Sequence, residues 1–262
     1  MVVQSKYQIQ SDLVKSLRGV IANISNEIVA HPEKYEDLVK NGSSLLGILE
    51  ANKRWARNVQ RVNPEFFNKQ NAGQQPTMLW IGCSDSRVPP THITQTKPGD
   101  FFVHRNIGNA VHSLDMNANA VMQYSIDALK VKHVIVCGHY KCGAVKAGMG
   151  KNTGLPIIEQ WIANIRNLDD QIHETLDKLD HELAFDLMCE LNAITNARNA
   201  CLTQVVQNAW KRGQPLTVHG WCYRLSTGII EDLKFEVSNP IKAESAYQSA
   251  IQDAIQRAVN KS

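Results

Sequence analysis

The chain has 262 residues, of which 43% are hydrophobic and 20% charged, and its formal net charge is +3. This composition is that of an ordinary folded protein and excludes extensive disorder. The small net charge, without a basic stripe, excludes an extended nucleic-acid surface, and no apolar run approaches the ~18 residues of a membrane-spanning helix.

The N-terminal segment carries apolar residues at helical spacing, namely Leu13, Leu17, Val20, Ile24 and Ile28. This spacing predicts an amphipathic helix that ends near Pro32. We interpret residues 1–44 as an N-terminal helical extension and residues 45–262 as a single α/β domain. A transit peptide is the alternative, because basic residues outnumber acidic ones before Glu27.

The six cysteines are scattered along the chain, whereas disulfide frameworks crowd into short secreted domains. We therefore expect a reducing compartment and a cytoplasmic localisation. If the N-terminal extension is a transit peptide, the destination is a mitochondrion or another organelle instead.

The next predicted elements are a helix over Ser44–Arg61 and a loop or brief helix over 63–76. After them the apolar period changes to that of short strands. These runs cover residues 77–82, 100–105, 133–139 and 215–224.

Helical patterns separate these runs, and the clearest covers Ser113–Val131, with Ser113 as the expected N-cap. Further helices are expected near 142–149, 156–177 and 180–212. Strands that alternate with helices predict an α/β fold with a mainly parallel central sheet. Residues 229–237 follow the turn signal "STG" and predict an antiparallel edge strand paired with the preceding run.

Three side chains that commonly bind metals lie at the ends of predicted strands: Cys83, His139 and Cys142. In an open α/β sheet, binding residues collect beyond the carboxyl ends of the strands. Two thiolates and one imidazole suit Zn²⁺, and three protein ligands leave the fourth tetrahedral position open. The His-x-x-Cys spacing alone is weak support, because such spacings occur by chance and buried histidines usually only form hydrogen bonds.

Asp85 and Arg87 add chemistry beside the first cysteine. A carboxylate two residues from a zinc thiolate can accept a hydrogen bond from a zinc-bound hydroxide, and an arginine can keep that carboxylate ionised and oriented. The alternative is an ordinary surface ion pair, which contributes little to stability.

The motifs "CSDSR", "FVHRNIGN" and "GHYKCG" together resemble the β-class carbonic anhydrases, and the resemblance extends from about Leu45 to Val237. It implies reversible hydration of carbon dioxide to bicarbonate. It also implies one Zn²⁺ per chain, held by Cys83, His139 and Cys142. The catalytic residues that it implies are Asp85, Arg87 and Gln74.

The resemblance also implies a substrate pocket lined by Val88, Phe102, Tyr124 and Gly143. The family builds this cleft at a dimer interface, so we expect a homodimer or homotetramer. Zinc lowers the pKa of bound water from ~15.7 to about 7, and the hydroxide then attacks carbon dioxide. His104 and His92 are candidates for the proton relay, with a structural or surface role as the alternative for each.

Trp80, Arg105 and Tyr223 match residues that mark a bacterial-like subgroup of the family regulated by bicarbonate. The resemblance implies a second bicarbonate bound by these three side chains. In that subgroup Asp85 leaves the arginine and occupies the fourth zinc position, which closes the site. The alternative is that the two aromatic residues pack the core and Arg105 anchors a loop.

Two other functions stay open at this point. Relatives on this fold hydrolyse CS₂ or COS with a similar zinc site, and the sequence does not define the access path that separates the substrates. A non-catalytic zinc protein that binds bicarbonate is the other alternative. The presence of Asp85, Arg87 and Gln74 argues against it.

Overall fold

The computed structural model describes residues 45–262. The chain divides into two compact units, Met1–Gly73 and Gln74–Ser262. The described part of the first unit holds α3 (Leu45–Val62) and α4 (Phe66–Asn71), in agreement with the predicted helix and the brief helix after it. The predicted helix over Leu13–Ile28 and the boundary after residue 44 lie outside the described residues and stay predictions.

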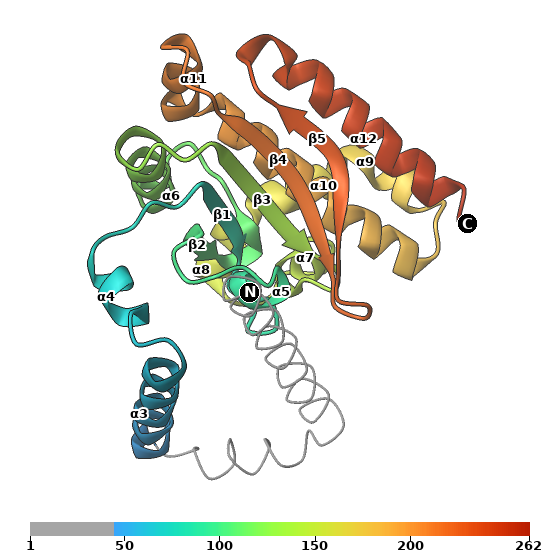
Figure 1. The fold of residues 1–262 in the computed structure, drawn as a ribbon. Coiled ribbons are helices and arrows are strands. Elements are labelled where there is room, and N and C mark those ends of the chain that lie inside the picture. Colours follow the sequence, from blue (N-terminus) through green and yellow to red (C-terminus); the bar gives the residue numbers. More distant parts are fainter. Residues whose placement is uncertain (1–44) are drawn as a thin grey trace, which may run out of the picture. The chain divides into compact units, whose positions relative to one another are not determined.

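The second unit is built on a five-stranded sheet with the order β2-β1-β3-β4-β5 (Figure 1). Its strands are β1 (Met78–Cys83), β2 (Phe101–Asn106), β3 (His133–His139), β4 (Thr217–Arg224) and β5 (Ile229–Val237). The first four strands pair in parallel, and β5 pairs antiparallel with β4. The predicted fold class and all five strands are confirmed.

Helices connect the strands and cover the sheet. They are α5 (Pro90–Ile93), η1 (Ile107–Asn109), α6 (Met116–Gln123), η2 (Tyr124–Ala128), α7 (Gly143–Gly148), α8 (Pro156–Trp161), α9 (Ala163–Leu176), α10 (His181–Leu202), α11 (Gln204–Lys211), η3 (Pro240–Lys242) and α12 (Ala243–Val259). Helix α10 packs on β3 and β4, and α12 packs on α10 and β5 (Figure 1). Among residues 45–262 no helix combines the length and the apolarity of a membrane span.

The predicted N-cap of the helix after β2 was wrong. Helix α6 begins at Met116, and the Asp115 carboxylate caps it by accepting a hydrogen bond of 2.9 Å from the Asn117 N–H. Ser113 lies outside the helix. Aspartate and serine are equally good N-caps, so the pattern could not separate two candidates only two residues apart.

Two long predicted helices are each divided. The segment 156–177 breaks at Ile162 into α8 and α9. The segment 180–212 breaks at Thr203, which has an extended ψ of 144° and whose hydroxyl caps α11. Helix α12 was not predicted from the sequence.

The position of the candidate site follows from the order of the strands. The chain leaves β1 toward β2 on one side and returns to β3 on the other side of β1. The carboxyl ends of β1 and β3 therefore frame the switch point of the sheet, where α/β proteins bind ligands. Cys83 ends β1 and His139 ends β3.

Candidate metal centre

Cys83, His139 and Cys142 meet at this switch point and are called the donor cluster below. Their sulfur and ring-nitrogen atoms all lie within 4.8 Å of one another. All three residues are buried. Cys142 stands at the N-cap of α7 in an extended conformation. The predicted convergence of the three side chains is confirmed.

The imidazole of His139 is oriented by the peptide that follows it. Its Nδ1 lies 3.0 Å from the main-chain oxygen of Tyr140, so Nδ1 carries the proton and donates it. Its Nε2 is buried without a hydrogen-bond partner among the described residues. A buried polar atom without a partner is unfavourable, and a metal ion bound to Nε2 and the two thiols would satisfy it. This donor set fits a tetrahedral zinc ion.

The two thiols of the donor cluster differ in their proton affinity. A hydrogen bond from Cys142, supported by His139, lowers the pKa of Cys83 to about 4 against the opposing effect of burial. The same hydrogen bond and burial raise the pKa of Cys142 well above its usual value. The lowered pKa of Cys83 favours its thiolate, which is the form of cysteine that binds metals.

Asp85 and Arg87, called the rim pair below, stand beside the donor cluster. Asp85 Oδ1 accepts hydrogen bonds from the main-chain N–H and Nε of Arg87 at 2.9 and 3.0 Å, and Oδ2 accepts one from Nη2 at 2.7 Å. These bonds hold the pKa of Asp85 well below its usual range. Asp85 Oδ2 lies 3.8 Å from Nε2 of His139, so an ionised carboxylate faces the donors.

Arg105 holds the loop that carries the rim pair. From β2 its Nε donates to the main-chain oxygen of Cys83 at 2.8 Å, and its Nη2 donates to the main-chain oxygen of Asp85. The loop-anchoring contact named as the alternative role of Arg105 is therefore present.

The two aromatic residues of the predicted bicarbonate pocket lie on the sheet face opposite to α10. Trp80 is fully buried, and Tyr223 packs in the same apolar cluster. The indole Nε1 of Trp80 has no hydrogen-bond partner among the described residues. A Cβ atom at Gly82 would lie only 2.3 Å from this nitrogen, so the indole position requires glycine there.

The predicted substrate-pocket residues occupy different environments. Val88 is buried, and its N–H donates to the Asp85 main-chain oxygen at 3.1 Å. Gly143 faces open space, since a Cβ atom there would meet no heavy atom within 4 Å. Phe102 and Tyr124 pack against each other with ring centroids 5.7 Å apart and ring planes tilted by 38°. Tyr124 and Gln74 are exposed, so in this chain they lie outside the buried donor cluster.

The two candidate relay histidines differ in solvent access. His104 is buried, its Nε2 lies 3.2 Å from Nδ2 of Asn106, and burial lowers its pKa. His92, in α5, is exposed.

Sequence reasoning missed a connected group of polar and charged side chains next to the donor cluster, called the anchor cluster below, in which Tyr140 and Glu190 are buried and the other members are half-buried. Its members are Tyr140, Asp186, Glu190, Arg224, Glu231 and Arg257. The only sequence signal was the position of Tyr140 inside "GHYKCG", between two donors.

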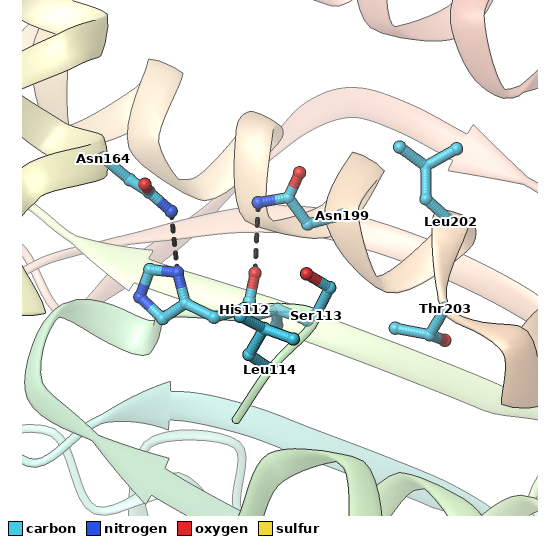
Figure 2. A pocket seen from close by; sticks show the side chains of 8 residues that line it. His112, Ser113, Leu114, Asn164, Asn199, Leu202 and Thr203 are labelled. Carbon is cyan, nitrogen blue, oxygen red and sulfur yellow. Dashed lines mark hydrogen bonds between the residues drawn. The ribbon is translucent and has the colours of Figure 1, made fainter. Parts of the chain in front are cut away.

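A separate cavity of about 440 Å³ contains no member of these groups. It is lined by Val111, His112, Ser113, Leu114, Asn164, Asn199, Leu202 and Thr203. Figure 2 shows that Asn164 contacts the His112 ring, at 2.6 Å between Nδ2 and Nδ1, and that Asn199 donates to the Val111 main-chain oxygen at 3.1 Å.

Fold and site together define a class: an α/β enzyme with a metal centre at the switch point of a parallel sheet and an ionised carboxylate beside it. The family model described as carbonic anhydrase matches residues 78–230 of the chain. A carbonic anhydrase of Emericella nidulans is 41% identical over 190 residues, which are 72% of this chain and 83% of that relative.

Solved structures agree with this match. The Coccomyxa β-carbonic anhydrase in complex with acetazolamide has a TM-score of 0.73 and 40% identity, over 77% of this chain and 91% of that one. A tetrameric β-carbonic anhydrase from Sordaria macrospora has a TM-score of 0.70 and 34% identity, over 73% and 97% of the two chains. The chain belongs to the β class of the carbonic anhydrase family, and it is a carbonic anhydrase enzyme.

Proposed function

We propose that the chain catalyses the reversible hydration of carbon dioxide to bicarbonate with one zinc ion, held by Cys83, His139 and Cys142. The observation that carries the proposal is the buried, unpartnered Nε2 of His139 beside two thiols. When bound, zinc supplies a Lewis acid that brings the pKa of water from ~15.7 to about 7.

The rim pair then acts as an orienting group. Because Arg87 keeps Asp85 ionised, the carboxylate can accept a hydrogen bond from the attacking water. This hydrogen bond directs a lone pair of the water oxygen toward carbon dioxide. Val88 holds the same loop, and the open space at Gly143 leaves room for a small linear substrate.

We further propose that a second copy of the chain completes the substrate cleft in a homodimer or homotetramer. Tyr124 is exposed here, and the family resemblance assigns it to a substrate cleft at a subunit interface; Gln74, which the resemblance makes catalytic, is exposed as well. Helix α3 carries exposed apolar side chains at Ile48, Leu49 and Trp55, and such a surface favours burial on a partner. The Sordaria relative is described as tetrameric.

The test is a stopped-flow assay of carbon dioxide hydration on zinc-replete protein, together with metal analysis and a measurement of the molar mass of the protein in solution. We expect about one zinc per chain and rapid hydration. Hydrolysis of CS₂ or COS without hydration would favour the alternative enzyme, and bound zinc without turnover would favour a bicarbonate-binding protein.

We also propose that bicarbonate inhibits the enzyme at Trp80, Arg105 and Tyr223. Two observations support this: the buried Trp80 Nε1 lacks a partner among the described residues, and Arg105 holds the loop that carries Asp85. An anion that takes the donors of Arg105 would release this loop. Asp85 would then leave Arg87 and complete the donor set itself.

This regulation is tested by titrating bicarbonate against the hydration rate at several pH values in wild type, Tyr223→Phe and Tyr247→Phe. Tyr247 is a matched control because its hydroxyl lies near Thr195 in the α10–α12 contact. In wild type we expect activity to rise with pH more steeply than one titrating group permits. Of the two variants, only Tyr223→Phe should show weaker bicarbonate inhibition. Equal inhibition in all three proteins would contradict the proposal.

A further inference from the structure

Tyr140 stands between two members of the donor cluster, and its main-chain oxygen receives the Nδ1–H of His139 at 3.0 Å. A histidine that binds a metal through one nitrogen is oriented by the acceptor of its other nitrogen. In this chain that acceptor belongs to the neighbouring peptide. The position of the Tyr140 backbone therefore sets the rotation of the His139 ring.

The Tyr140 side chain is held on several sides. It is 1% exposed. Its hydroxyl lies 2.8 Å from Glu190 Oε1 in α10 and 2.7 Å from Glu231 Oε2 in β5. The guanidinium of Arg224 lies over its ring, 3.6 Å from the centroid. Its main-chain N–H donates to the Tyr223 oxygen at 3.0 Å.

The residues around Tyr140 are in turn bound to one another. Arg224 donates to Glu231 Oε1 and to Asp186 Oδ2, each at 2.7 Å. Arg257 of α12 donates to Glu190 Oε2 at 2.7 Å. The anchor cluster thus joins β4, β5, α10 and α12 to the turn that carries His139 and Cys142.

We propose that Tyr140 is a positioning residue for the metal ligand His139, and that the anchor cluster out to Arg257 fixes it in place. This inference rests on the proposed zinc function. Tyr140 touches no reacting atom in this role. It acts through its main-chain oxygen, and the buried hydroxyl contacts keep that oxygen where the Nδ1–H of His139 needs it.

A positioning role and a purely structural role of the anchor cluster differ in what changes when one of its contacts is lost. Losing a buried charge-assisted hydrogen bond lowers stability wherever it occurs. Losing the partner that orients a metal-binding histidine also weakens metal binding, typically by about 10- to 100-fold. A purely structural anchor cluster would give the first effect alone.

The experiment compares Tyr140→Phe and Arg257→Gln with the control Arg198→Gln. Arg198 also joins α10 to α12, through Glu244 at 2.8 Å, but belongs to neither the donor cluster nor the anchor cluster. Each protein is prepared with cobalt in place of zinc for visible spectra. Each zinc form is also mixed with a chelator to measure the rate of zinc release, and its melting temperature is recorded.

We expect Tyr140→Phe to release zinc about 10-fold faster and to change the cobalt spectrum, with a smaller change of the same sign in Arg257→Gln. Arg198→Gln should match wild type in both measurements. Wild-type spectra and release rates in Arg257→Gln and in folded Tyr140→Phe would overturn the inference. If Tyr140→Phe does not fold, the result for Arg257→Gln decides the test. The Arg257 side chain is 36% exposed, so we expect this variant to fold. Failure of wild type to bind stoichiometric metal would instead refute the proposed zinc function.

Discussion

The donor cluster is flanked by two carboxylate–arginine arrangements that differ in origin and in the exposure of their arginines. The rim pair comes from one short loop, and the Arg87 side chain is 56% exposed. The anchor cluster comes from β4, β5, α10, α12 and the turn after β3, and its Tyr140 is buried. Asp85 faces His139 directly, whereas the carboxylates of the anchor cluster reach the donor cluster only through Tyr140.

The rim pair is therefore a local contact with an exposed arginine, whereas the anchor cluster is a set of linked contacts between distant elements. An exposed pair contributes little to stability and is therefore available for the reaction and for the proposed switch of Asp85. A buried pair resists any change that leaves one partner alone.

His139→Ala removes the ligand that both arrangements flank. We expect loss of zinc and a fall in hydration activity of more than about 100-fold, beyond the range for loss of an outer partner. Metal analysis and stopped-flow assays measure the two effects. Full zinc content with full activity would show that the ligand assignment is wrong.

Asp85→Asn tests the rim pair. The amide keeps the size of the side chain but loses the charge that the attacking water needs, so kcat should fall by about 100-fold. Zinc content and melting temperature should stay close to wild type, because the pair is partly exposed. A large loss of stability would remove the contrast between the two arrangements.

Glu190→Gln tests the anchor cluster. Glu190 is 7% exposed and binds both Tyr140 and Arg257. Loss of its charge should lower the free energy of unfolding by about 2 kcal/mol, measured by chemical denaturation. An effect as small as that of Glu244→Gln, which affects the more exposed Arg198–Glu244 pair, would contradict the assigned role of burial.

Gly143→Ala adds a methyl group to the open space beside Cys142. Because no atom lies within 4 Å of the new Cβ, stability should not change. If Gly143 lines the substrate pocket, kcat/KM should fall by about 10-fold, since one methyl group in a pocket has effects of this size. Unchanged kinetics would place the substrate elsewhere.

His104→Gln addresses the pH dependence of stability. Burial lowers the pKa of His104 in the folded protein, so its contribution is present above its ordinary pKa of ~6.5 and is lost as the pH falls. Asp85 and Glu231 have lowered pKa values and stay ionised in this range. Wild type should therefore lose stability between about pH 7 and 5, and the variant should lose less. Parallel curves would contradict this.

The donor cluster and the rim pair were predictable because their signals are local. Cys83 and His139 each follow an apolar run that has to be a strand, and the carboxyl ends of parallel strands meet at one edge. Asp85 and Arg87 are two residues apart, so their pairing needs no knowledge of the fold.

The anchor cluster could not be predicted for the opposite reason. Glu190 and Glu231 meet Tyr140 only after α10 and β5 have packed, and no local pattern records that packing. Helix α12 was missed because its buried face is made of small residues, Ala250, Ala254 and Ala258. Alanines contribute little to the apolar periodicity from which helices are predicted.

The Glu190–Arg257 contact also has a consequence for how the protein is made. Synthesis runs from the N-terminus, so all three donors leave the ribosome well before α12 does. On the proposed zinc function, zinc can bind before Arg257, which supports Tyr140 through Glu190, has been synthesised. A nascent chain stalled before residue 243 would then hold metal less tightly than a chain that includes α12, so the emergence of α12 would strengthen metal binding.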